Sequence, residues 1–251
     1  MQLELSGKSA LVTGASRGLG RAIAEVLHRE GCRVAVNGRH ADNLAAAVTQ
    51  MPGAVTVTGD ITQPDDARRV VAAALAALGG LDILICNVGS GRSVPPGEED
   101  YGEWQRVFGV NLWSATNMVE AARAALAASR GAIVCISSIC GLEVVPGAPV
   151  TYSAAKAALH AYVRGIARPL GRDGVRINAV APGNLLFDGS VWSRRLADDA
   201  GSVEEMLASD VPLGRLGGPR EVADLVAYLA SPRASFATGS VWTMDGGQVR
   251  R

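Results

Sequence analysis

A tyrosine and a lysine stand four positions apart in the stretch TYSAAK, as Tyr152 and Lys156. Because four residues make just over one helical turn, a helix would present both side chains on the same face. A free tyrosine has a pKa near ~10 and is a poor base at neutral pH, but a neighbouring cation favours the charged phenolate. The two residues are therefore either a proton-transferring pair or two exposed side chains on an ordinary helix. The spacing alone is common by chance and does not decide between these interpretations.

A glycine-rich turn lies near the N-terminus, in TGASRGLG at residues 13–20. Gly14, Gly18 and Gly20 let the backbone turn sharply and approach a ligand closely, because glycine has no Cβ. The turn follows an apolar run and precedes a helical pattern, and a helix N-terminus offers unpaired N–H groups and partial positive charge to an anion. We interpret the stretch as a pyrophosphate-binding turn; the alternative is a tight turn with a structural role only.

The residues that follow the apolar stretches 33–37 and 54–58 bear on the identity of the nucleotide. NAD-binding proteins with such a turn carry an acidic residue ~20 positions after the glycines, where it binds the ribose 2′-hydroxyl. Gly38 occupies this place, and Arg39 follows it. Arg39 and Arg17 would attract a 2′-phosphate, so we predict NADP(H) rather than NAD(H), unless both arginines are simply solvated. Asp60 would receive the adenine amino group or serve only in a turn.

These residues would be positioned by short apolar runs that alternate with helical patterns along the whole chain. The apolar runs cover residues 9–13, 33–37, 54–58, 81–86, 132–137, 176–181 and 240–244. They are continuously apolar, as in strands covered on both faces, and helical stretches such as 21–31, 65–80 and 104–128 lie between them. The alternation predicts an α/β fold with a doubly wound, parallel, Rossmann-type sheet of about seven strands. Because no change of composition marks a second domain, residues 1–251 are expected to form one.

Two segments depart from this alternation. Residues 89–100 are rich in glycine, proline and serine, and residues 184–210 lie between a strand and the next helix. Structureless connections longer than ~12–15 residues are uncommon and often functional. Ser202 and Glu205 have the spacing of a capping box, so we expect a short helix inside a mobile lid over residues 184–210.

The bulk composition argues against several classes of function. Lysine plus arginine equals aspartate plus glutamate, at 24 each, and aromatic residues make up 4% of the chain. Nothing therefore indicates a nucleic acid or an anionic membrane surface as a partner. No apolar run has the length of a membrane span, and the N-terminus does not read as a secretory signal. The four cysteines lack zinc-site spacing, so we expect a cytoplasmic protein with free thiols and no metal site.

In their order along the chain, the motifs resemble those of the short-chain dehydrogenase/reductase family over essentially the whole length. They are TGASRGLG (13–20), GDI (59–61), CNVG (86–89), Asn111, ISS (136–138), YSAAK (152–156), NAVAPG (178–183) and MDGG (244–247). The resemblance implies that Tyr152 is the general acid/base and that Ser138 holds the carbonyl. It further implies that Lys156 lowers the tyrosine pKa and that Asn111 supports a water relay.

The same resemblance implies a set of cofactor-binding residues spread along the carboxyl ends of the strands. The set comprises Gly14, Ser16, Arg17, Gly18, Leu19, Gly20, Gly38, Arg39, Asp60, Ile61, Asn87, Gly89, Tyr152, Lys156, Pro182, Gly183 and Leu185.

Three departures from the family pattern fall near the expected site. The usual N-N-A-G is C-N-V-G at residues 86–89, which retains the asparagine and the last glycine. The separation from Ser138 to Tyr152 is one residue longer than the commonest form, and we place the extra residue within 142–151. N-L-L at residues 184–186 follows Pro182-Gly183, where a threonine often stands shortly after to hold the carboxamide. The lid is therefore expected to meet the nicotinamide differently.

The resemblance is greatest to the β-ketoacyl-carrier-protein reductases, so we expect an NADPH-dependent enzyme that reduces the ketone of a small-molecule substrate, with a 3-oxoacyl thioester as one candidate. The alternatives are a dehydrogenase that oxidises a sugar-type or other secondary alcohol, and a catalytically silent NADP-binding regulatory protein. Arg92, Arg194 and Arg195 either face an anionic substrate or are solvated loop cations.

The family resemblance also implies a homotetramer. The helical stretches 104–128 and 151–167 keep apolar or small residues on more than one face, as expected when a second subunit covers one of them. The terminal residues 240–251 include a strand whose edge would pack across a two-fold axis. The alternative is that these are alanine-rich helices in the core of one large monomer.

Overall fold

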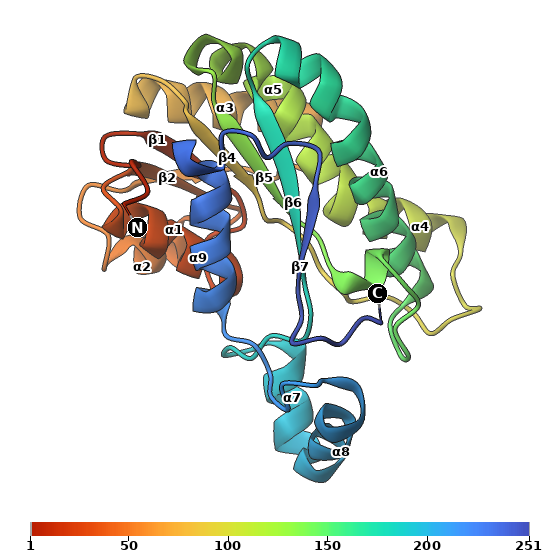
Figure 1. The fold of residues 1–251 in the computed structure, drawn as a ribbon. Helices are drawn as coiled ribbons and strands as arrows, with labels where there is room; N and C mark the ends of the chain where they lie inside the picture. Colours follow the sequence, from red (N-terminus) through yellow and green to blue (C-terminus); the bar gives the residue numbers. More distant parts are fainter. Residues whose placement is uncertain (1, 251) are drawn as a thin grey trace.

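The computed structural model describes residues 2–250, and within them the chain forms a seven-stranded sheet (Figure 1). The strands are β1 (Ser9–Val12), β2 (Arg33–Gly38), β3 (Val55–Thr58), β4 (Ile83–Cys86), β5 (Ala132–Ile136), β6 (Arg176–Pro182) and β7 (Val241–Met244). Their order is β3-β2-β1-β4-β5-β6-β7, and all neighbours are parallel. The predicted Rossmann-type sheet is confirmed, with a strand at each of the seven apolar runs.

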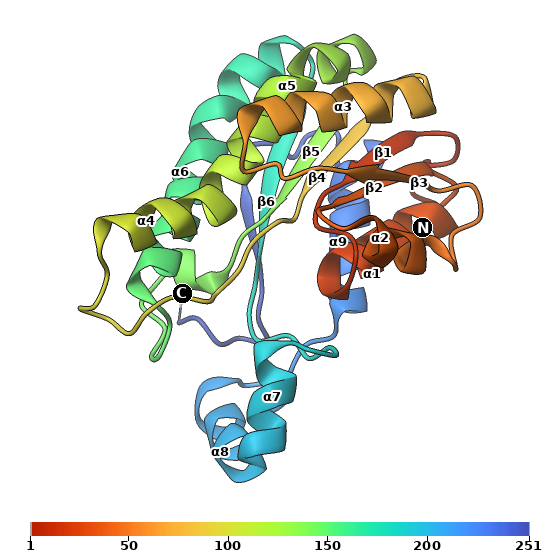
Figure 2. The ribbon, with the colours of Figure 1, turned by 180° about the vertical axis from the view of Figure 1, so that it is seen from behind.

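Helices cover both faces of the sheet, as Figures 1 and 2 show from opposite sides. One layer holds α1 (Gly18–Arg29), α2 (Ala41–Val48) and α9 (Pro219–Ala230); the other holds α3 (Pro64–Leu78), α5 (Ser114–Ser129) and α6 (Val150–Arg172). Successive residues of a strand point to opposite faces, so in β1 Val12 packs in the core beneath α1 and α9, and Leu11 in the core beneath α3 and α5. Both faces are buried, which explains why the strands are continuously apolar. Within residues 2–250, no helix combines the length and apolar character needed to cross a membrane.

The strand order reverses next to β1, which pairs with β2 on one side and with β4 on the other. In open parallel sheets, ligands bind at such a reversal, in the crevice outside the carboxyl ends of the strands. The connections that leave β1, β4, β5 and β6 at this end carry most of the residues singled out in the sequence. The topology therefore brings distant parts of the chain to one edge of the sheet.

The helical pattern expected over residues 104–128 is interrupted in the structure. It divides into α4 (Tyr101–Phe108), a π-helical turn η1 (Gly109–Trp113) and α5. Asn111, within the π-helical turn, donates from Nδ2 to the carbonyl oxygen of Val107, 3.0 Å away. This side-chain contact uses a backbone acceptor of the preceding helical turn, and π-turns inside helices are often found at functional sites.

Residues 186–216, here called the α7–α8 segment, extend beyond the carboxyl end of the sheet (Figures 1 and 2). They contain α7 (Val191–Asp198) and α8 (Ala200–Asp210). The segment contains the expected short helix, but Ser202 does not cap it, and α7 is an additional helix. Asp199 caps α8 instead, because its carboxylate accepts a hydrogen bond from Ser202 N at 3.0 Å. Ser190 caps α7 in the same way, through a 2.9 Å bond from Ser193 N.

The two ends of the α7–α8 segment lie side by side. Leu185 and Gly217 form an isolated parallel bridge. Gly217 N donates to Asn184 O and Leu186 N donates to Gly217 O, each at 2.9 Å. The chain thus leaves the body of the protein and returns to it at the same place.

Candidate active site

A cavity of about 340 Å³ lies at the carboxyl ends of the central strands. The glycine-rich turn after β1, the loop after β4, the end of β5, the start of α6, the end of β6 and the beginning of the α7–α8 segment all line it. It is the place where the sheet topology predicts a ligand.

The glycine-rich turn is held by contacts that leave no room for larger residues. Gly14 and Gly18 have φ angles of +61° and +56°, a region that side chains with a Cβ rarely adopt. A Cβ on Gly20 would lie 2.4 Å from Asn87 Nδ2 and 2.5 Å from Gly14 O. Asn87 Nδ2 itself donates to Thr13 O at 3.0 Å and to Gly14 O at 3.1 Å. The retained asparagine of the C-N-V-G motif therefore fastens the glycine-rich turn to the end of β4.

The N-terminus of α1 opens into this cavity without a side-chain cap. Arg17 occupies the N-cap position, and among the described residues no side chain accepts from the first turn of the helix, which also contains no acidic residue. Gly18, Leu19 and Gly20 of that turn line the cavity. The free N–H groups and the positive end of the helix dipole make this an anion site, so the turn fits the pyrophosphate of a nicotinamide dinucleotide.

The residues expected at the adenine end of the cofactor lie at the ends of β2 and β3, outside the lining of this cavity. Gly38 ends β2, and Arg39 follows it with an exposed side chain. Asp60 accepts from the backbone N–H of Thr62 at 3.1 Å and from its hydroxyl at 2.8 Å. The turn role for Asp60 is thus present in the structure, and a contact with adenine stays a prediction. Ile61 is buried below it.

Tyr152 and Lys156 lie on the first turns of α6 and both line the cavity. Ser138, at the end of β5, faces the same space, and its hydroxyl accepts a 3.2 Å hydrogen bond from Cys140 N. Lys156 is buried, and its Nζ donates to Ile136 O at 2.9 Å. The ammonium also lies 5.8 Å from the centroid of the Tyr152 ring. The structure therefore brings the predicted serine, tyrosine and lysine together on one wall.

The relative position of β5 and α6 depends on Gly141, which the sequence analysis did not single out. A Cβ on Gly141 would lie 2.6 Å from the carbonyl carbon of Lys156 and 2.8 Å from Ala157 N. Glycine is required here by close backbone approach, since its φ angle is not among the positive ones. Such a requirement arises between segments that are distant in sequence, so no local pattern could have indicated it.

Burial shifts the pKa values of both ionisable groups on this wall, Tyr152 and Lys156. Burial raises the pKa of Tyr152 to about 12, while the Ser138 hydroxyl acts on that pKa in the opposite direction. Burial lowers the pKa of Lys156 from 10.5 to about 8. Without a bound cofactor, the tyrosine hydroxyl is thus protonated at neutral pH and the lysine carries a positive charge. That Lys156 lowers the pKa of Tyr152 during turnover stays a prediction.

Asn111 is buried next to this wall and fixes the loop that follows β4. Its Oδ1 accepts from Ser90 N at 2.9 Å, and its Nδ2 donates to Ser90 O at 3.0 Å. A Cβ on Gly89 would lie 3.1 Å from both Asn111 Oδ1 and Lys156 Nζ. Asn111 and Lys156 thus approach the same point of the backbone, and the water relay implied for Asn111 stays a prediction.

Of the residues predicted from the sequence, thirteen line the cavity: Gly14, Arg17, Gly18, Leu19, Gly20, Asn87, Gly89, Ser138, Tyr152, Lys156, Pro182, Gly183 and Leu185. Ser16, Gly38, Arg39, Asp60, Ile61 and Asn111 are not among its lining residues. The structure adds Phe187, which occupies the region where the family pattern led us to look for a threonine. A Cβ on Gly18 would lie 2.6 Å from the Phe187 ring, so this ring packs directly over the glycine-rich turn.

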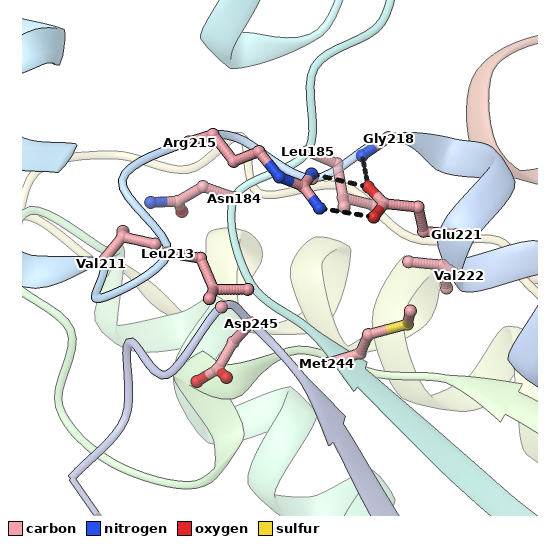
Figure 3. A pocket seen from close by; sticks show the side chains of 12 residues that line it. Asn184, Leu185, Val211, Leu213, Arg215, Gly218, Glu221, Val222, Met244 and Asp245 are labelled. Carbon is pink, nitrogen blue, oxygen red and sulfur yellow. Dashed lines mark hydrogen bonds and ion pairs between the residues drawn. The ribbon is translucent and has the colours of Figure 1, made fainter.

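A smaller hollow of about 100 Å³ lies at the foot of the α7–α8 segment, and Figure 3 shows its lining. Arg215 donates from both Nη atoms to the carboxylate of Glu221, at 2.9 and 2.7 Å, across this hollow. Glu221 also accepts from Gly218 N at 2.8 Å at the start of α9. The returning end of the α7–α8 segment is therefore fastened to the body by a bidentate ion pair and a helix cap.

Within residues 2–250, no group of three or more histidine, cysteine, aspartate or glutamate side chains lies in an arrangement that could hold a metal ion. The four cysteines are free thiols, and Cys32, Cys86 and Cys135 are buried.

Comparison with known proteins supports the same assignment of the fold. The sequence model of the family described as Enoyl-(Acyl carrier protein) reductase matches residues 14–248. The chain is 36% identical, over 98% of both sequences, to 3-oxoacyl-[acyl-carrier-protein] reductase of Escherichia coli. It is also 36% identical to L-rhamnose 1-dehydrogenase (NAD(P)(+)) of a Sphingomonas species, over 97% of this chain and 96% of that protein.

The structure is likewise similar to that of L-sorbose reductase from Gluconobacter frateurii in complex with NADPH and L-sorbose. The TM-score is 0.93 at 28% identity, with the whole of both chains covered. These relatives act on different substrates, so the similarity shows a shared fold and chemistry and leaves the substrate open.

Proposed function

The chain belongs to the short-chain dehydrogenase/reductase family, and from that premise we propose that it is an NADPH-dependent enzyme that reduces a ketone to a secondary alcohol. Membership makes it an oxidoreductase that uses a nicotinamide cofactor and acts on carbonyl or alcohol groups. The observation that carries the proposal is the wall formed by Ser138, Tyr152 and Lys156 opposite the glycine-rich turn. A cofactor held by that turn would have its reactive end close to a proton donor.

The preference for NADPH rests on charge at the adenine end. A cofactor with a 2′-phosphate carries extra negative charge, which an acid at position 38 would repel. Gly38 provides no such acid, and the exposed Arg17 and Arg39 have no ion pair among the described residues. A charge-assisted contact with phosphate contributes ~1.5–3 kcal/mol, or roughly one to two decades in affinity.

The proposed chemistry divides between the cofactor and the protein. A nicotinamide cofactor, held by the glycine-rich turn, would supply the hydride that reduces the carbonyl carbon. Ser138 donates a hydrogen bond to the carbonyl oxygen and orients it, and Tyr152 delivers its hydroxyl proton to that oxygen as negative charge develops. Lys156, charged at neutral pH, and Asn111 lie behind the tyrosine, where they stabilise the phenolate and support its reprotonation. Together, the hydride and the proton complete the alcohol.

Three further features belong to the proposal. Residues 1–251 act as one domain, within which residues 184–210 close over the substrate as a lid. A 3-oxoacyl thioester is one candidate substrate. Oxidation of a sugar-type alcohol is the second candidate reaction, favoured by the similarity to L-rhamnose 1-dehydrogenase. The protein assembles as a homotetramer, and the cytoplasmic location expected from the sequence stays a prediction.

The experiment that tests the proposal is a panel of ketones, 3-oxoacyl thioesters and sugars, each with NADPH and with NADH. We expect steady NADPH consumption with at least one ketone, and tighter binding of NADPH than of NADH in a direct titration. Arg39→Ala should reduce the affinity for NADPH by roughly 10- to 100-fold and leave that for NADH nearly unchanged. Tight binding of NADPH without turnover of any carbonyl or alcohol would instead support a silent regulatory protein.

A further inference from the structure

The cavity beside Tyr152 is positively charged, although the chain as a whole is neutral. Arg17, Arg92, Lys156 and Arg194 line it, and within the described chain no aspartate or glutamate does. The chain has 24 basic and 24 acidic residues, so this imbalance is local. Water-excluding walls strengthen the field of such charges, and the cavity therefore concentrates anions.

Two of these four cations, Arg92 and Arg194, have no role in the reaction proposed above. Lys156 lies behind Tyr152, and Arg17 belongs to the turn proposed to bind the cofactor phosphates. Arg92 comes from the loop after β4, and Arg194 comes from α7. Neither guanidinium has an ion pair in the described part of the chain.

Two neighbouring arginines, in contrast, do have partners and do not line the cavity. Arg106, on α4, pairs with Glu103 at 2.6 Å and donates to the carbonyl oxygen of Arg92 at 2.9 Å. Arg195, adjacent to Arg194 on α7, lies 4.9 Å from the centroid of the Trp192 ring and outside the cavity lining. Asp188 is exposed near the start of α7 and does not line the cavity.

Hydrogen bonds anchor the backbone of Arg92 and the side chain of Arg194. Arg92 N donates to Ser90 Oγ at 3.2 Å, and Ser90 is held by Asn111 as described above. Arg194 donates from its guanidinium Nε to Ser190 O at 3.3 Å, which holds that edge of the guanidinium against the cap of α7. Two guanidinium groups that line one cavity, one from the loop after β4 and one from α7, are suited to bind carboxylate or phosphate oxygens together.

We propose that Arg92 and Arg194 form a subsite for an anionic group on the substrate, so that the preferred substrate is a ketone that carries a carboxylate or a phosphate. This inference rests on the proposed ketone reduction, because it assigns the substrate of the same cavity. It adds a specificity determinant to that reaction: the charged end of the substrate binds between the β4–α4 loop and α7. The carbonyl then lies toward Ser138 and Tyr152.

Matched pairs of substrates test the proposal. A 3-oxo acid and its methyl ester differ by one carboxylate, and the 3-oxoacyl thioesters of phosphopantetheine and of pantetheine differ by one phosphate. We expect kcat/KM with NADPH to be roughly 10- to 100-fold higher for the anionic member of at least one pair, as one charge-assisted contact would provide. The two pairs show whether the recognised group is a carboxylate or a phosphate.

Three variants test which arginines cause the preference for the anionic substrate. Arg92→Gln and Arg194→Gln should each reduce the ratio of kcat/KM for the anionic member to that for the neutral member by roughly tenfold or more. Arg195→Gln is the matched control on the same helix and should leave this ratio as in the parent protein. The Kd of NADPH is measured for all of them, since a loss of cofactor affinity in place of the substrate ratio would assign the two arginines to the cofactor and overturn the proposal.

Direct binding of both members of each pair to the NADP⁺ complex separates this inference from the proposed function. Equal Kd values and equal kcat/KM values for the anionic and neutral members would overturn the anionic subsite while leaving the reductase intact. Selective binding of the anionic member without any reduction would support the subsite and overturn the reaction. No binding of any member by the NADP⁺ complex would overturn the anionic subsite, while the reductase would still be judged by the wider panel of substrates.

Discussion

At the scale of single residues, the buried ammonium of Lys156 should make the stability of the protein depend on pH in a defined window. Burial lowers the pKa of Lys156 from 10.5 to about 8, so folding releases the lysine proton between these two values. The contribution of Lys156 to the free energy of unfolding should therefore rise with pH from about 8 to 10.5, by up to ~1.4 kcal/mol per pH unit, and be constant below 8.

Denaturant unfolding of the parent protein and of Lys156→Met at several pH values from 7 to 10 measures this effect. The difference in unfolding free energy between the two proteins should grow in favour of the parent as the pH rises. Burial raises the pKa of Tyr152 to about 12, which lowers the free energy of unfolding only as the pH rises above the ordinary tyrosine value of about 10, at the upper end of the measured range. A difference that stays constant from pH 7 to 10 would contradict the lowered lysine pKa.

The hydroxyl of Tyr152 is expected to carry the proton-transfer step. Tyr152→Phe should retain the fold but lose turnover by ~10²–10⁴-fold, the usual contribution of general acid–base catalysis. Tyr162→Phe is a suitable control because Tyr162 lies on the same helix but packs in the core beneath α3 and α5. Circular dichroism checks the fold of both variants, and kcat on the substrate found in the panel measures the effect. A Tyr152→Phe protein with near-parental kcat would refute the proposed acid.

At the scale of secondary-structure elements, Glu221 is expected to control the order of the α7–α8 segment. Glu221→Gln keeps an oxygen that can accept from Gly218 N but loses the ion pair with Arg215. The segment should then be cleaved faster by proteases within residues 186–216, while the melting temperature of the body changes little. The adjacent exposed pair Arg220–Asp224 supplies the control, Asp224→Asn, which removes a similar contact on α9 away from the hollow.

The ion pair between Arg215 and Glu221 also predicts that the order of the α7–α8 segment depends on pH. Hydrogen bonds from Arg215, and next from Gly218, lower the pKa of Glu221 from 4.5 to about 2. Because the folded pKa is depressed, the contact is fully present above pH 4.5 and is lost as the pH falls towards 2. Protection of residues 186–216 from an acid-active protease should decline over this range in the parent protein and not in Glu221→Gln. Identical profiles for the two proteins would show that this carboxylate does not hold the segment.

The elements differ in how far the sequence could predict them. Strands such as 132–136 were predictable because burial on both faces leaves a continuously apolar run, and the glycine-rich turn because positive φ angles need glycine at Gly14 and Gly18. Gly141 and Phe187 were not predictable, since each acts through a contact with a distant part of the chain. The division of the 104–128 pattern at Asn111 was missed because a π-helical turn keeps nearly helical periodicity. Asp199 rather than Ser202 caps α8, and residue spacing alone does not distinguish between these two candidates.

At the scale of the whole molecule, the open edge of β7 is the surface expected to form part of a homotetramer. An unpaired edge strand favours association unless something covers it, and β7 ends the sheet order. Phe236, just before β7, is fully exposed, and Trp242 Nε1 on β7 is buried without a hydrogen-bond partner among the described residues. An isologous contact across a two-fold axis would cover both features.

Sedimentation velocity at micromolar concentration tests the assembly. The parent protein should sediment as a tetramer, and Phe236→Asp should produce smaller species, because the contact would then bury two unpaired carboxylates. Val144→Asp is the control, since Val144 is almost equally exposed but lies in the loop before α6. A parent protein that is monomeric and fully active would refute the tetramer. Tetramers of unchanged stability for Phe236→Asp would place the interface elsewhere.

The bridge between Leu185 and Gly217 has an evolutionary consequence. Because the two ends of the α7–α8 segment are neighbours at one strand spacing, ~4.8 Å, a foreign sequence with similarly spaced ends could be spliced in without changing the register of β6 or the start of α9. Ser138, Tyr152 and Lys156 all lie outside the spliced region, while Arg194 lies inside it. Recombination at this junction would exchange the residues proposed to recognise the substrate and keep the residues proposed to catalyse the reaction. Chimaeras joined at residues 185 and 217 therefore offer a direct route to new specificities.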